Sequence, residues 1–143
     1  MKTVRQILDR KGTDIYSIAP EDTVLDAIKL MADKGVGAVL AIDKNQVVGI
    51  LSERDYARKV VLKGKSSRNT PVSEIMTQRV IYVSPDRSVE ECMALMTEKR
   101  VRHLPVMEGG ALIGIISIGD VVKALISNQK FMIEQLERYI MGH

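Results

Sequence analysis

The sequence predicts an α+β protein made of two β-α-β-β-α repeats packed with pseudo-twofold symmetry, followed by an extended C-terminal helix. Residues 49–55, Gly-Ile-Leu-Ser-Glu-Arg-Asp, return 65 positions later as residues 114–120, Gly-Ile-Ile-Ser-Ile-Gly-Asp. Around this pair, residues 15–60 align with residues 80–125 without a gap, and ten of the 46 aligned pairs are identical. Apolar residues change between strand and helix spacing in the same order in both copies.

Each repeat is expected to contain the same elements in the same order. A short helical turn leads to a strand, an amphipathic helix, a hairpin of two strands and a final helix. The turns and strands are expected, first copy before second, at residues 4–8 and 72–76, 15–18 and 80–84, 37–42 and 102–107, and 46–51 and 111–116. Thr23 and Ser88 are the expected N-caps of the amphipathic helices, because apolar residues at helical spacing follow each of them.

Three segments are expected along the chain. They are the first repeat with its N-terminal lead-in and connecting loop (1–70), the second repeat (71–126) and a C-terminal helical extension (127–143). A repeat of about 55 residues buries little apolar surface alone, so the two repeats are expected to pack face to face. Such packing would create two related clefts, and a ligand site is expected there.

Each copy ends its second hairpin strand at a serine that is followed three residues later by an aspartate. The pairs are Ser52 with Asp55 and Ser117 with Asp120. The first turn of a helix has unpaired N–H groups and the positive end of the helix dipole, which together favour a phosphate. A serine hydroxyl can turn toward a phosphate oxygen, and an ionised aspartate can accept hydrogen bonds from both hydroxyls of a ribose. The pattern therefore suits a nucleotide.

The same pattern also has a purely structural interpretation. Ser-x-x-Asp before an apolar helical run is close to a capping box, in which the two side chains only close the start of the helix. Capping does not require the glycine that stands three residues before the serine in both copies, Gly49 and Gly114. The repeated glycine therefore favours the ligand interpretation.

Composition limits the classes of protein and its location. The chain is 45% hydrophobic and 27% charged with a net charge of +3, which favours anionic small molecules but does not by itself indicate nucleic acid or membrane. No apolar run is long enough to cross a bilayer and the N-terminus lacks the apolar region of a signal peptide, so a cytoplasmic location is expected. The single cysteine, Cys92, rules out an internal disulfide framework and is expected to be a buried small side chain.

No group of residues indicates catalysis or a metal site. The sequence has no Ser-His-Asp set and no Walker or Rossmann glycine pattern, and His103 has only the terminal His143 as a second histidine. Arg100, Arg102 and His103 are candidates for phosphate contacts or for solvated charges at a strand edge. The basic run within residues 58–68 favours an exposed loop over a nucleic-acid site, because the chain has one Phe and no Trp.

Three motifs of the second repeat, with counterparts in the first, resemble the paired CBS-domain (Bateman) module. They are Val-Ser-Glu-Ile-Met-Thr at 72–77, Arg-Val-Arg-His-Leu-Pro-Val at 100–106 and Gly-Ile-Ile-Ser-Ile-Gly-Asp at 114–120. Residues 52–59, 64–67 and 139–140 also resemble the CBSX-like stand-alone CBS pairs of bacteria and plant organelles. The resemblance implies a non-catalytic regulatory module for energy sensing and signal transduction. Its implied regulatory ligand is AMP, ADP, ATP or NAD, with S-adenosylmethionine in some members, and no catalytic cofactor is implied.

The resemblance also implies one nucleotide site in the cleft of each repeat, with the ribose on the aspartate and the phosphate facing the serine. For the first cleft the implied residues are Thr13, Asp14, Ile15, Tyr16, Gly37, Ala38, Val39, Ser52, Arg54 and Asp55. For the second cleft they are Thr77, Gln78, Val80, Ile81, Arg102, His103, Leu104, Pro105, Ser117, Gly119 and Asp120. Because Arg54 stands where the second copy has Gly119, the two sites are expected to differ in affinity or in ligand.

The apolar residues after Val121 keep helical spacing to about Met141, with an interruption at residues 127–130. This is longer than one repeat requires, so the second half of the tail is expected to pack against another copy of the chain and form a homodimer. Because the chain has no effector domain, a ligand-dependent change would be transmitted to a separate effector protein. The alternative is an interaction or scaffold module with degenerate pockets, including a regulator of a redox partner.

Overall fold

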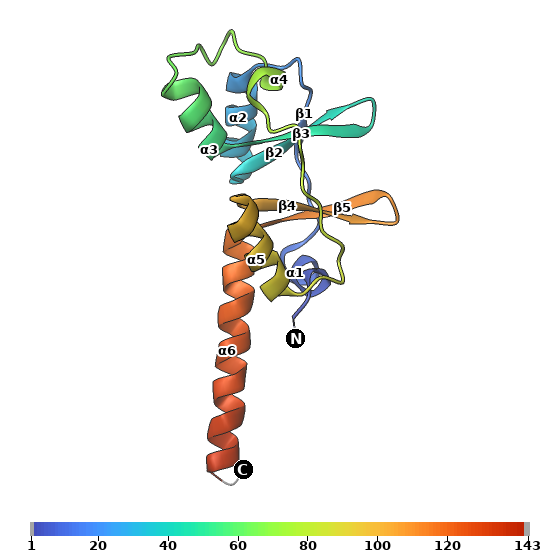
Figure 1. Cartoon of the computed structure of the whole chain (residues 1–143), viewed down its shortest axis with the longest axis vertical. Helices are drawn as coiled ribbons and strands as arrows, with labels where there is room; N and C mark the ends of the chain where they lie inside the picture. The colour runs from blue at the N-terminus through green and yellow to red at the C-terminus, as the bar shows by residue number, and fades with distance from the viewer. Residues whose placement is uncertain (1, 142–143) are drawn as a thin grey trace. The chain divides into compact units, whose positions relative to one another are not determined.

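The computed structural model describes residues 2–141 and confirms an α+β fold with two copies of the same elements and a long C-terminal helix (Figure 1). The chain packs as two compact units. The first-repeat unit contains residues 15–80, and the second-repeat unit contains residues 2–14 together with residues 81–141.

The first-repeat unit is a three-stranded sheet with helices. Its elements are β1 (Ser17–Ile18), α2 (Val24–Lys34), β2 (Ala38–Asp43), β3 (Gln46–Ser52), α3 (Glu53–Asp55), the π-helical turn η1 (Tyr56–Val61) and α4 (Val72–Ile75). The strand order is β1-β2-β3, with β1 parallel and β3 antiparallel to β2. Its apolar core is built around Val24, Met31 and Leu51, which are at most 2% exposed.

The second-repeat unit repeats the hairpin and extends its last helix. Its elements are α1 (Val4–Lys11), α5 (Val89–Lys99), β4 (His103–Glu108), β5 (Ala111–Ser117) and α6 (Ile118–Ile140). Strands β4 and β5 pair antiparallel, and the register shifts between Val106 and Met107 as it does between Ala41 and Ile42 in the first copy. The two hairpins therefore have the same geometry.

The expected strand at residues 80–84 is wrong, because only Val83 forms a bridge, a parallel one to Val106. In the first copy the N–H of Leu40 donates to the carbonyl of Tyr16 at 3.1 Å. Pro105 stands at the position of Leu40 and has no N–H, so this hydrogen bond cannot form in the second copy. One proline therefore shortens the parallel ladder. The first strand is also shorter than expected, since β1 covers residues 17–18 and not 15–18.

The predicted helix caps are confirmed. The Oγ1 of Thr23 accepts from the N–H of Asp26 at 3.2 Å, and the Oγ of Ser88 accepts from the N–H of Glu91 at 3.1 Å. Each hairpin turns through two residues with positive φ, Lys44 and Asn45 in the first copy and two glycines in the second. Two-residue turns of this kind match the twist of the strands they join.

Each short lead-in helix packs with the other repeat, and not with the repeat that follows it in the sequence. Helix α1 belongs to the second-repeat unit, and α4 belongs to the first-repeat unit. A Cβ on Gly114 would lie 2.7 Å from a methyl carbon of Leu8 in α1, and a Cβ on Gly49 would lie 2.5 Å from the sulfur of Met76, next to α4. The repeated glycine thus allows a lead-in segment to lie against the second hairpin strand.

This exchange changes the division of the chain. The sequence suggests a boundary at residues 70 and 71, whereas the compact units divide near residues 14 and 80. The physical reason is that the apolar faces of α1 and α4 complete the cores of the units in which they are buried. Val4 and Ile7 are buried in one core, and Val72 and Ile75 in the other.

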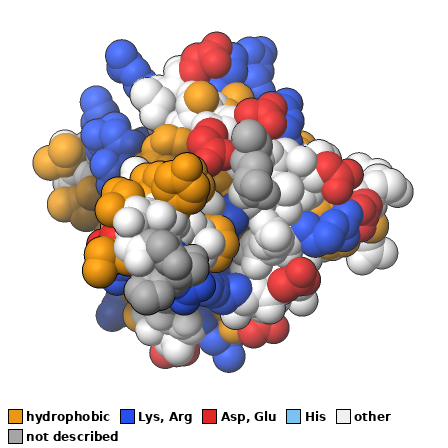
Figure 2. Space-filling view, turned by 90° about the horizontal axis from the view of Figure 1, so that it is seen from below, with side chains coloured by type: hydrophobic (Ala, Val, Ile, Leu, Met, Phe, Trp, Pro, Cys, Tyr) orange, Lys and Arg blue, Asp and Glu red, His pale blue; other side chains and the backbone are white. Residues whose placement is uncertain are grey.

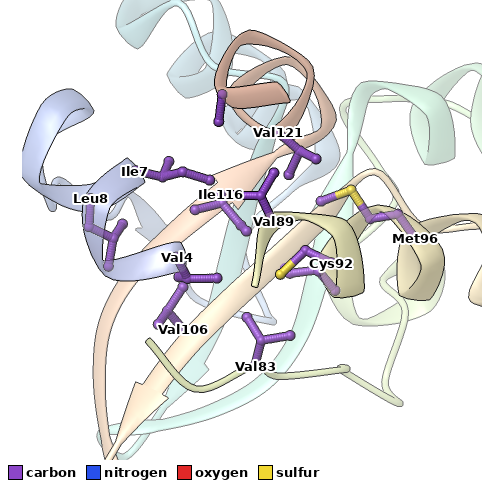
Figure 3. Packing of buried hydrophobic residues seen from close by; sticks show 12 residues of the cluster. Val4, Ile7, Leu8, Val83, Val89, Cys92, Met96, Val106, Ile116 and Val121 are labelled. Atoms are coloured by element: carbon purple, nitrogen blue, oxygen red, sulfur yellow. The ribbon is translucent and has the colours of Figure 1, made fainter. Parts of the chain in front are cut away.

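Cys92 is buried in the core of the second-repeat unit, at 1% exposure, beside Val83, Val89 and Met96 (Figure 3). Desolvation by burial raises the pKa of its thiol to about 11. The prediction of a buried small side chain is therefore confirmed, and the thiol has little thiolate character at neutral pH.

Helix α6 runs without a break through residues 127–130, where the apolar spacing is interrupted. The last residues of the expected extension, 142 and 143, lie outside the described part of the chain. Among the described helices, none combines the length and apolar character needed to span a membrane.

Candidate functional site

Both Ser-x-x-Asp corners form capping boxes. The Oγ of Ser52 accepts from the N–H of Asp55 at 3.1 Å, and Asp55 Oδ2 accepts from the N–H of Ser52 at 3.0 Å. At the second corner the corresponding distances, for Ser117 and Asp120, are 3.2 and 2.8 Å. The structural interpretation of the pattern is therefore correct for both copies, and any ligand must bind to groups that already close a helix.

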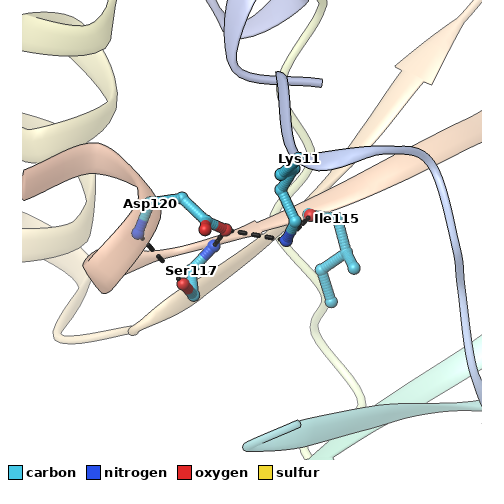
Figure 4. Close-up of polar contacts among 4 residues, drawn as sticks. All are labelled: Lys11, Ile115, Ser117 and Asp120. Atoms are coloured by element: carbon cyan, nitrogen blue, oxygen red, sulfur yellow. Dashed lines mark hydrogen bonds and ion pairs between the residues drawn. The ribbon is translucent and has the colours of Figure 1, made fainter. Parts of the chain in front are cut away.

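The Asp120 corner has a second partner from a distant part of the chain (Figure 4). Lys11 Nζ, at the end of α1, lies 2.7 Å from Asp120 Oδ2 and also donates to the carbonyl oxygen of Ile115 at 2.9 Å. Every one of these contacts of Asp120 uses Oδ2 or the backbone N–H, and Oδ1 takes part in none of them. One carboxylate oxygen is therefore available to accept hydrogen bonds from a diol.

The charge state of Asp120 follows from these neighbours. Burial favours the neutral acid and by itself would raise the pKa of Asp120. Hydrogen bonds from Lys11 and Ser117, with the positive charge of Lys11, outweigh burial and hold the pKa of Asp120 below its ordinary value. The carboxylate is therefore ionised at neutral pH, as ribose recognition requires.

The Asp55 corner is arranged differently. Its Oδ2 accepts from both the N–H and the hydroxyl of Ser52, while its Oδ1 lies 3.4 Å from Nζ of Lys59, one turn along the same helical segment. Lys59 also donates to the carbonyl oxygen of Ile75 at 3.1 Å. Both carboxylate oxygens of Asp55 are engaged, and both partners come from its own unit.

A pocket of about 240 Å³ opens beside Asp120, between α1 and α6. Its lining is Lys2, Gln6, Ile7, Arg10, Lys11, Asp120, Lys123 and Ala124. Four cationic side chains thus surround one carboxylate that is already paired with Lys11. Arg10 also donates to the Oγ of Ser127 at 3.4 Å. The pocket has a net positive lining, which suits an anionic group.

Sequence analysis did not identify Lys2, Arg10, Lys11 or Lys123 as site residues. The only signal in the sequence was that Gln6 and Arg10 are four residues apart in the lead-in segment, so that both lie on one face of a helix. Their relevance depends on α1 packing against α6, which the local sequence does not indicate.

The hairpins bring other predicted site residues to the two corners. Ala38 pairs opposite Ser52, and the carbonyl of Gly37 accepts from the N–H of Glu53 at 3.0 Å. In the second copy His103 pairs opposite Ser117, and the carbonyl of Arg102 accepts from the N–H of Ile118 at 2.8 Å. Arg54 and Gly119 occupy the helical turn between each serine and aspartate.

Three predicted wall residues point into the interior. Val39 and Leu104 are at most 1% exposed and belong to the two apolar cores, and Pro105 is buried as well. These side chains are therefore buried in this structure, and the assignment of the three residues to a cleft wall stays a prediction. Any contact from Val39 or Leu104 would come from the backbone.

The segments expected to line the adenine sites are divided between the units. Thr13 and Asp14 belong to the second-repeat unit, whereas Ile15 and Tyr16 belong to the first-repeat unit. Likewise Thr77, Gln78 and Val80 fall in the first-repeat unit and Ile81 in the other. Within its unit, Thr77 exchanges two backbone hydrogen bonds with Ile50, and Nζ of Lys34 lies 5.5 Å from the centre of the Tyr16 ring.

The described residues contain no cluster of three or more His, Cys, Asp or Glu side chains that could hold a metal ion. The basic run is partly neutralised, since Lys59 pairs with Asp55 and Lys65 lies 3.4 Å from Glu74. These two ion pairs lower the net positive charge of the run.

The fold and the two corners define a tandem-repeat module, and comparison with known proteins gives the family. The CBS domain profile matches residues 4–62 and 72–127, so the chain belongs to the CBS-domain family and is a CBS pair, a regulatory module. It is 41% identical over 149 aligned positions to the mitochondrial CBS domain-containing protein CBSX3 of Arabidopsis thaliana, covering 98% of this chain and 72% of that one.

Solved structures agree with this assignment. A CBS-domain protein from Burkholderia ambifaria is 59% identical, with a TM-score of 0.86 over 90% of this chain and 96% of that one. The CBS domain pair of protein MJ0100, solved in complex with 5′-methylthioadenosine and S-adenosyl-L-methionine, has the same fold with a TM-score of 0.78 over 90% of this chain and 98% of that one, at 21% identity.

Proposed function

We propose that this CBS pair is a non-catalytic regulator that binds an adenine nucleotide, AMP, ADP, ATP or NAD, and transmits occupancy to a partner protein. The family assignment supports a regulatory module, and a member of the same fold was solved with two adenosine-containing ligands. The observation that carries the proposal is the Asp120 corner, where an ionised carboxylate has one oxygen outside its capping contacts and borders a cationic pocket.

The proposed roles follow from this geometry. Asp120 Oδ1 accepts the ribose hydroxyls, while Oδ2 keeps the contact with Ser117 that closes α6. The phosphates lie toward Lys2 and Arg10, whose positive charges attract them. Lys11 holds the carboxylate ionised before the ligand arrives. The second site, at Asp55, is proposed to be weaker because both of its oxygens are engaged.

Titration calorimetry with AMP, ADP, ATP, NAD and adenosine tests this proposal. We expect Asp120→Asn to weaken nucleotide binding at least tenfold, and Arg10→Met to weaken ATP binding without changing adenosine binding. Lys63→Met, in the exposed loop of the first-repeat unit, is the matched control and should bind normally. Absence of binding by the wild-type protein to every one of these compounds would refute the nucleotide proposal.

A second candidate is an interaction or scaffold module with degenerate pockets, including a regulator of a redox partner. The observation that favours it is the pair of complete capping boxes, because both serines and both aspartates already have a structural role. A ligand that binds only the folded protein raises its melting temperature. Nucleotide at 5 mM exceeds a Kd in the micromolar range by about a hundred times or more. Equal melting temperatures with and without this nucleotide would favour the scaffold.

Transmission to a partner requires that the ligand prefer one conformation of the chain. The homodimer expected from the sequence is part of the same proposal, because a second copy is the partner for which the chain itself supplies a surface. The identity of the effector protein and a cytoplasmic location stay predictions.

A further inference from the structure

The outer face of α6 carries a continuous apolar stripe. It consists of residues that are between 38% and 84% exposed: Val122, Ile126, Met132, Ile133, Leu136, Tyr139 and Ile140. Figure 2 looks toward the C-terminal end of this helix and shows hydrophobic side chains gathered around it. An exposed apolar surface of this extent on one element marks an interaction site.

In the first half of α6, the stripe is distinct from the side of the helix that packs on its own unit. Val121 and Ala124 are buried against the core of the second-repeat unit. At 100° per residue, these two lie on a different side of the helix from Val122 and Ile126, so α6 has two apolar faces. Within the described chain, only the face with Val121 and Ala124 is covered.

The spacing of the stripe is that of a helix pair. Ile126, Ile133 and Ile140 are separated by seven residues, and so are Met132 and Tyr139. A seven-residue apolar repeat keeps one side of a helix against a partner helix when the two helices supercoil around each other. Gln129 is the polar exception in the middle of the stripe.

We infer that the stripe binds the same stripe of a second copy of the chain, with the two α6 helices antiparallel. The inference rests on the homodimer of the proposed function and adds its surface, orientation and register. The 23 residues of α6 span about 35 Å, long enough for the stripe to supply much of the 800 Å² or so that each partner buries in a stable interface.

Charge complementarity determines the orientation. On the flank beside the stripe, the first half of α6 carries Lys123 and Lys130, and the second half carries Glu134 and Glu137. In an antiparallel pair related by a twofold axis, the same flank of both helices meets, so lysines face glutamates. In a parallel pair, the flank with the lysines and glutamates on one helix would meet the opposite flank of the other helix. That opposite flank carries no charged residue along the stripe that could pair with these lysines and glutamates. Arg138 lies on the far side of the helix and takes no part.

The same charges determine the register. Lys123 opposite Glu137 gives a midpoint at residue 130, and Lys130 opposite Glu134 gives one at residue 132. A midpoint at residue 131 serves both pairs to within one residue, and it also brings the Lys130 side chains of the two copies near each other. With that midpoint Val122 lies opposite Ile140 of the partner subunit, and Ile126 lies opposite its Leu136. The apolar and charged residues thus agree on one register, which is the consistency expected of a specific helix pair.

Cysteine cross-linking tests the orientation. Two differently tagged chains, one with Val122→Cys and one with Ile140→Cys, are co-expressed and oxidised. We expect a disulfide between the two chains and none in either variant alone, because equal positions of an antiparallel pair lie about 27 Å apart at residue 122. Wild-type protein is the control for Cys92, which is buried. Disulfides within each single variant, and none between the two, would overturn the antiparallel arrangement.

Light scattering at about 50 μM tests the surface. We expect wild type to be a dimer, Ile133→Glu a monomer, and Gln135→Glu, which places the same charge on the opposite side of α6, a dimer. A wild-type monomer would overturn both this inference and the homodimer, whereas a dimer that survives Ile133→Glu would overturn the stripe alone. Calorimetry on Ile133→Glu keeps the nucleotide proposal separate, since binding at Asp120 does not involve the stripe.

A charge exchange gives an independent test of the register. Lys130→Glu alone should weaken the dimer several-fold, and the double variant Lys130→Glu with Glu134→Lys should restore it, because the pairs then form with reversed sign. Failure of the double variant to recover would overturn the register.

Discussion

The corners at Asp55 and Asp120 have the same local sequence pattern but different neighbouring residues in the structure. Each closes its helix with a capping box. At Asp55 the remaining oxygen pairs with Lys59, four residues away. At Asp120 the charge partner is Lys11, which is 109 residues away in sequence and reaches the corner because α1 packs beside α6.

The difference teaches that a repeated motif does not produce two equal sites. The capping geometry is determined by four consecutive positions and is therefore the same in both copies. The charge environment is determined by which lead-in helix packs nearby. Helix α1 brings cations to Asp120, and Lys11 binds the same oxygen that takes part in the capping box, so the other oxygen is left for a ligand. At Asp55 the corresponding oxygen is paired with Lys59, so the Asp120 corner is the better candidate for a ligand site.

The largest effect is expected from the repeated glycines. A Cβ on Gly49 would lie 2.8 Å from Cγ of Met76 and 3.1 Å from the backbone oxygen of Thr77, whereas a Cβ on Gly114 meets only the flexible end of Leu8. Overpacking costs roughly 1–3 kcal/mol. We expect Gly49→Ala to lower the free energy of unfolding by an amount near the top of that range and Gly114→Ala by less, measured by urea denaturation.

The control for this comparison is Gly119→Ala. The nearest atom to a Cβ at this position is 3.5 Å away, and the residue lies inside α6. Replacing a helical glycine with alanine stabilises by about 0.5–1 kcal/mol. If Gly114→Ala proved more costly than Gly49→Ala, the close approach of Thr77 would not be the deciding contact.

The serine caps are expected to have the next largest effect. Ser52→Ala and Ser117→Ala should each lower the free energy of unfolding by about 1 kcal/mol, the usual cost of losing an N-cap. Ser52→Ala should cost slightly more, because its hydroxyl also donates to Asp55 Oδ2 at 3.0 Å. Thermal denaturation measures both, and Ser→Thr at the same positions should recover most of the loss. A loss at one corner only would show that the capping boxes are not equivalent.

A pH dependence separates the corners further. Because the folded pKa of Asp120 is lowered, its contribution to stability is present above the unfolded pKa of about 3.9 and is lost as pH falls through the lower folded value. We expect the difference in unfolding free energy between wild type and Asp120→Asn to be largest near neutral pH and to shrink as pH falls from about 5 to 2. A difference that stayed constant over this range would mean that Lys11 and Ser117 do not stabilise the ionised form.

The smallest effect is expected from the lysine partners. Lys11→Met should lower stability by up to about 1 kcal/mol, because its ion pair with Asp120 is shorter, at 2.7 Å, and Lys11 is less exposed than Lys59. Lys59 is 44% exposed and 3.4 Å from its partner, so Lys59→Met should cost only a few tenths of a kcal/mol. Urea denaturation at 0.1 and 1 M salt measures both, and equal costs would contradict the difference in burial.

Much of the fold could be predicted from the sequence. The caps Thr23 and Ser88 and the two hairpins follow from local spacing, and all are confirmed. A strand was predicted at residues 80–84, and its absence was not foreseen although Pro105 is visible in the sequence. Its effect depends on which strand lies alongside it, and this is not a local property.

The candidate site was predicted only in part. Ser117 and Asp120 were identified because their chemistry and spacing suit a ligand. The cations at Lys2, Arg10 and Lys11 were not, because they belong to a segment that the repeat pattern assigns to the first copy. Val39 and Leu104 were assigned to a wall but face the cores, since the register of a strand decides which side is buried.

By itself, the sequence determined the repeats, the helix caps and the apolar stripe of α6, because each depends on residues within a few turns or strand positions of one another. Tertiary structure alone decided that α1 packs with the second repeat and α4 with the first. That exchange places Lys11 against Asp120 and gives two similar corners different charges. The physical reason is that burial of an apolar helix face selects its partner by complementarity across the fold, and nearness in sequence does not decide it.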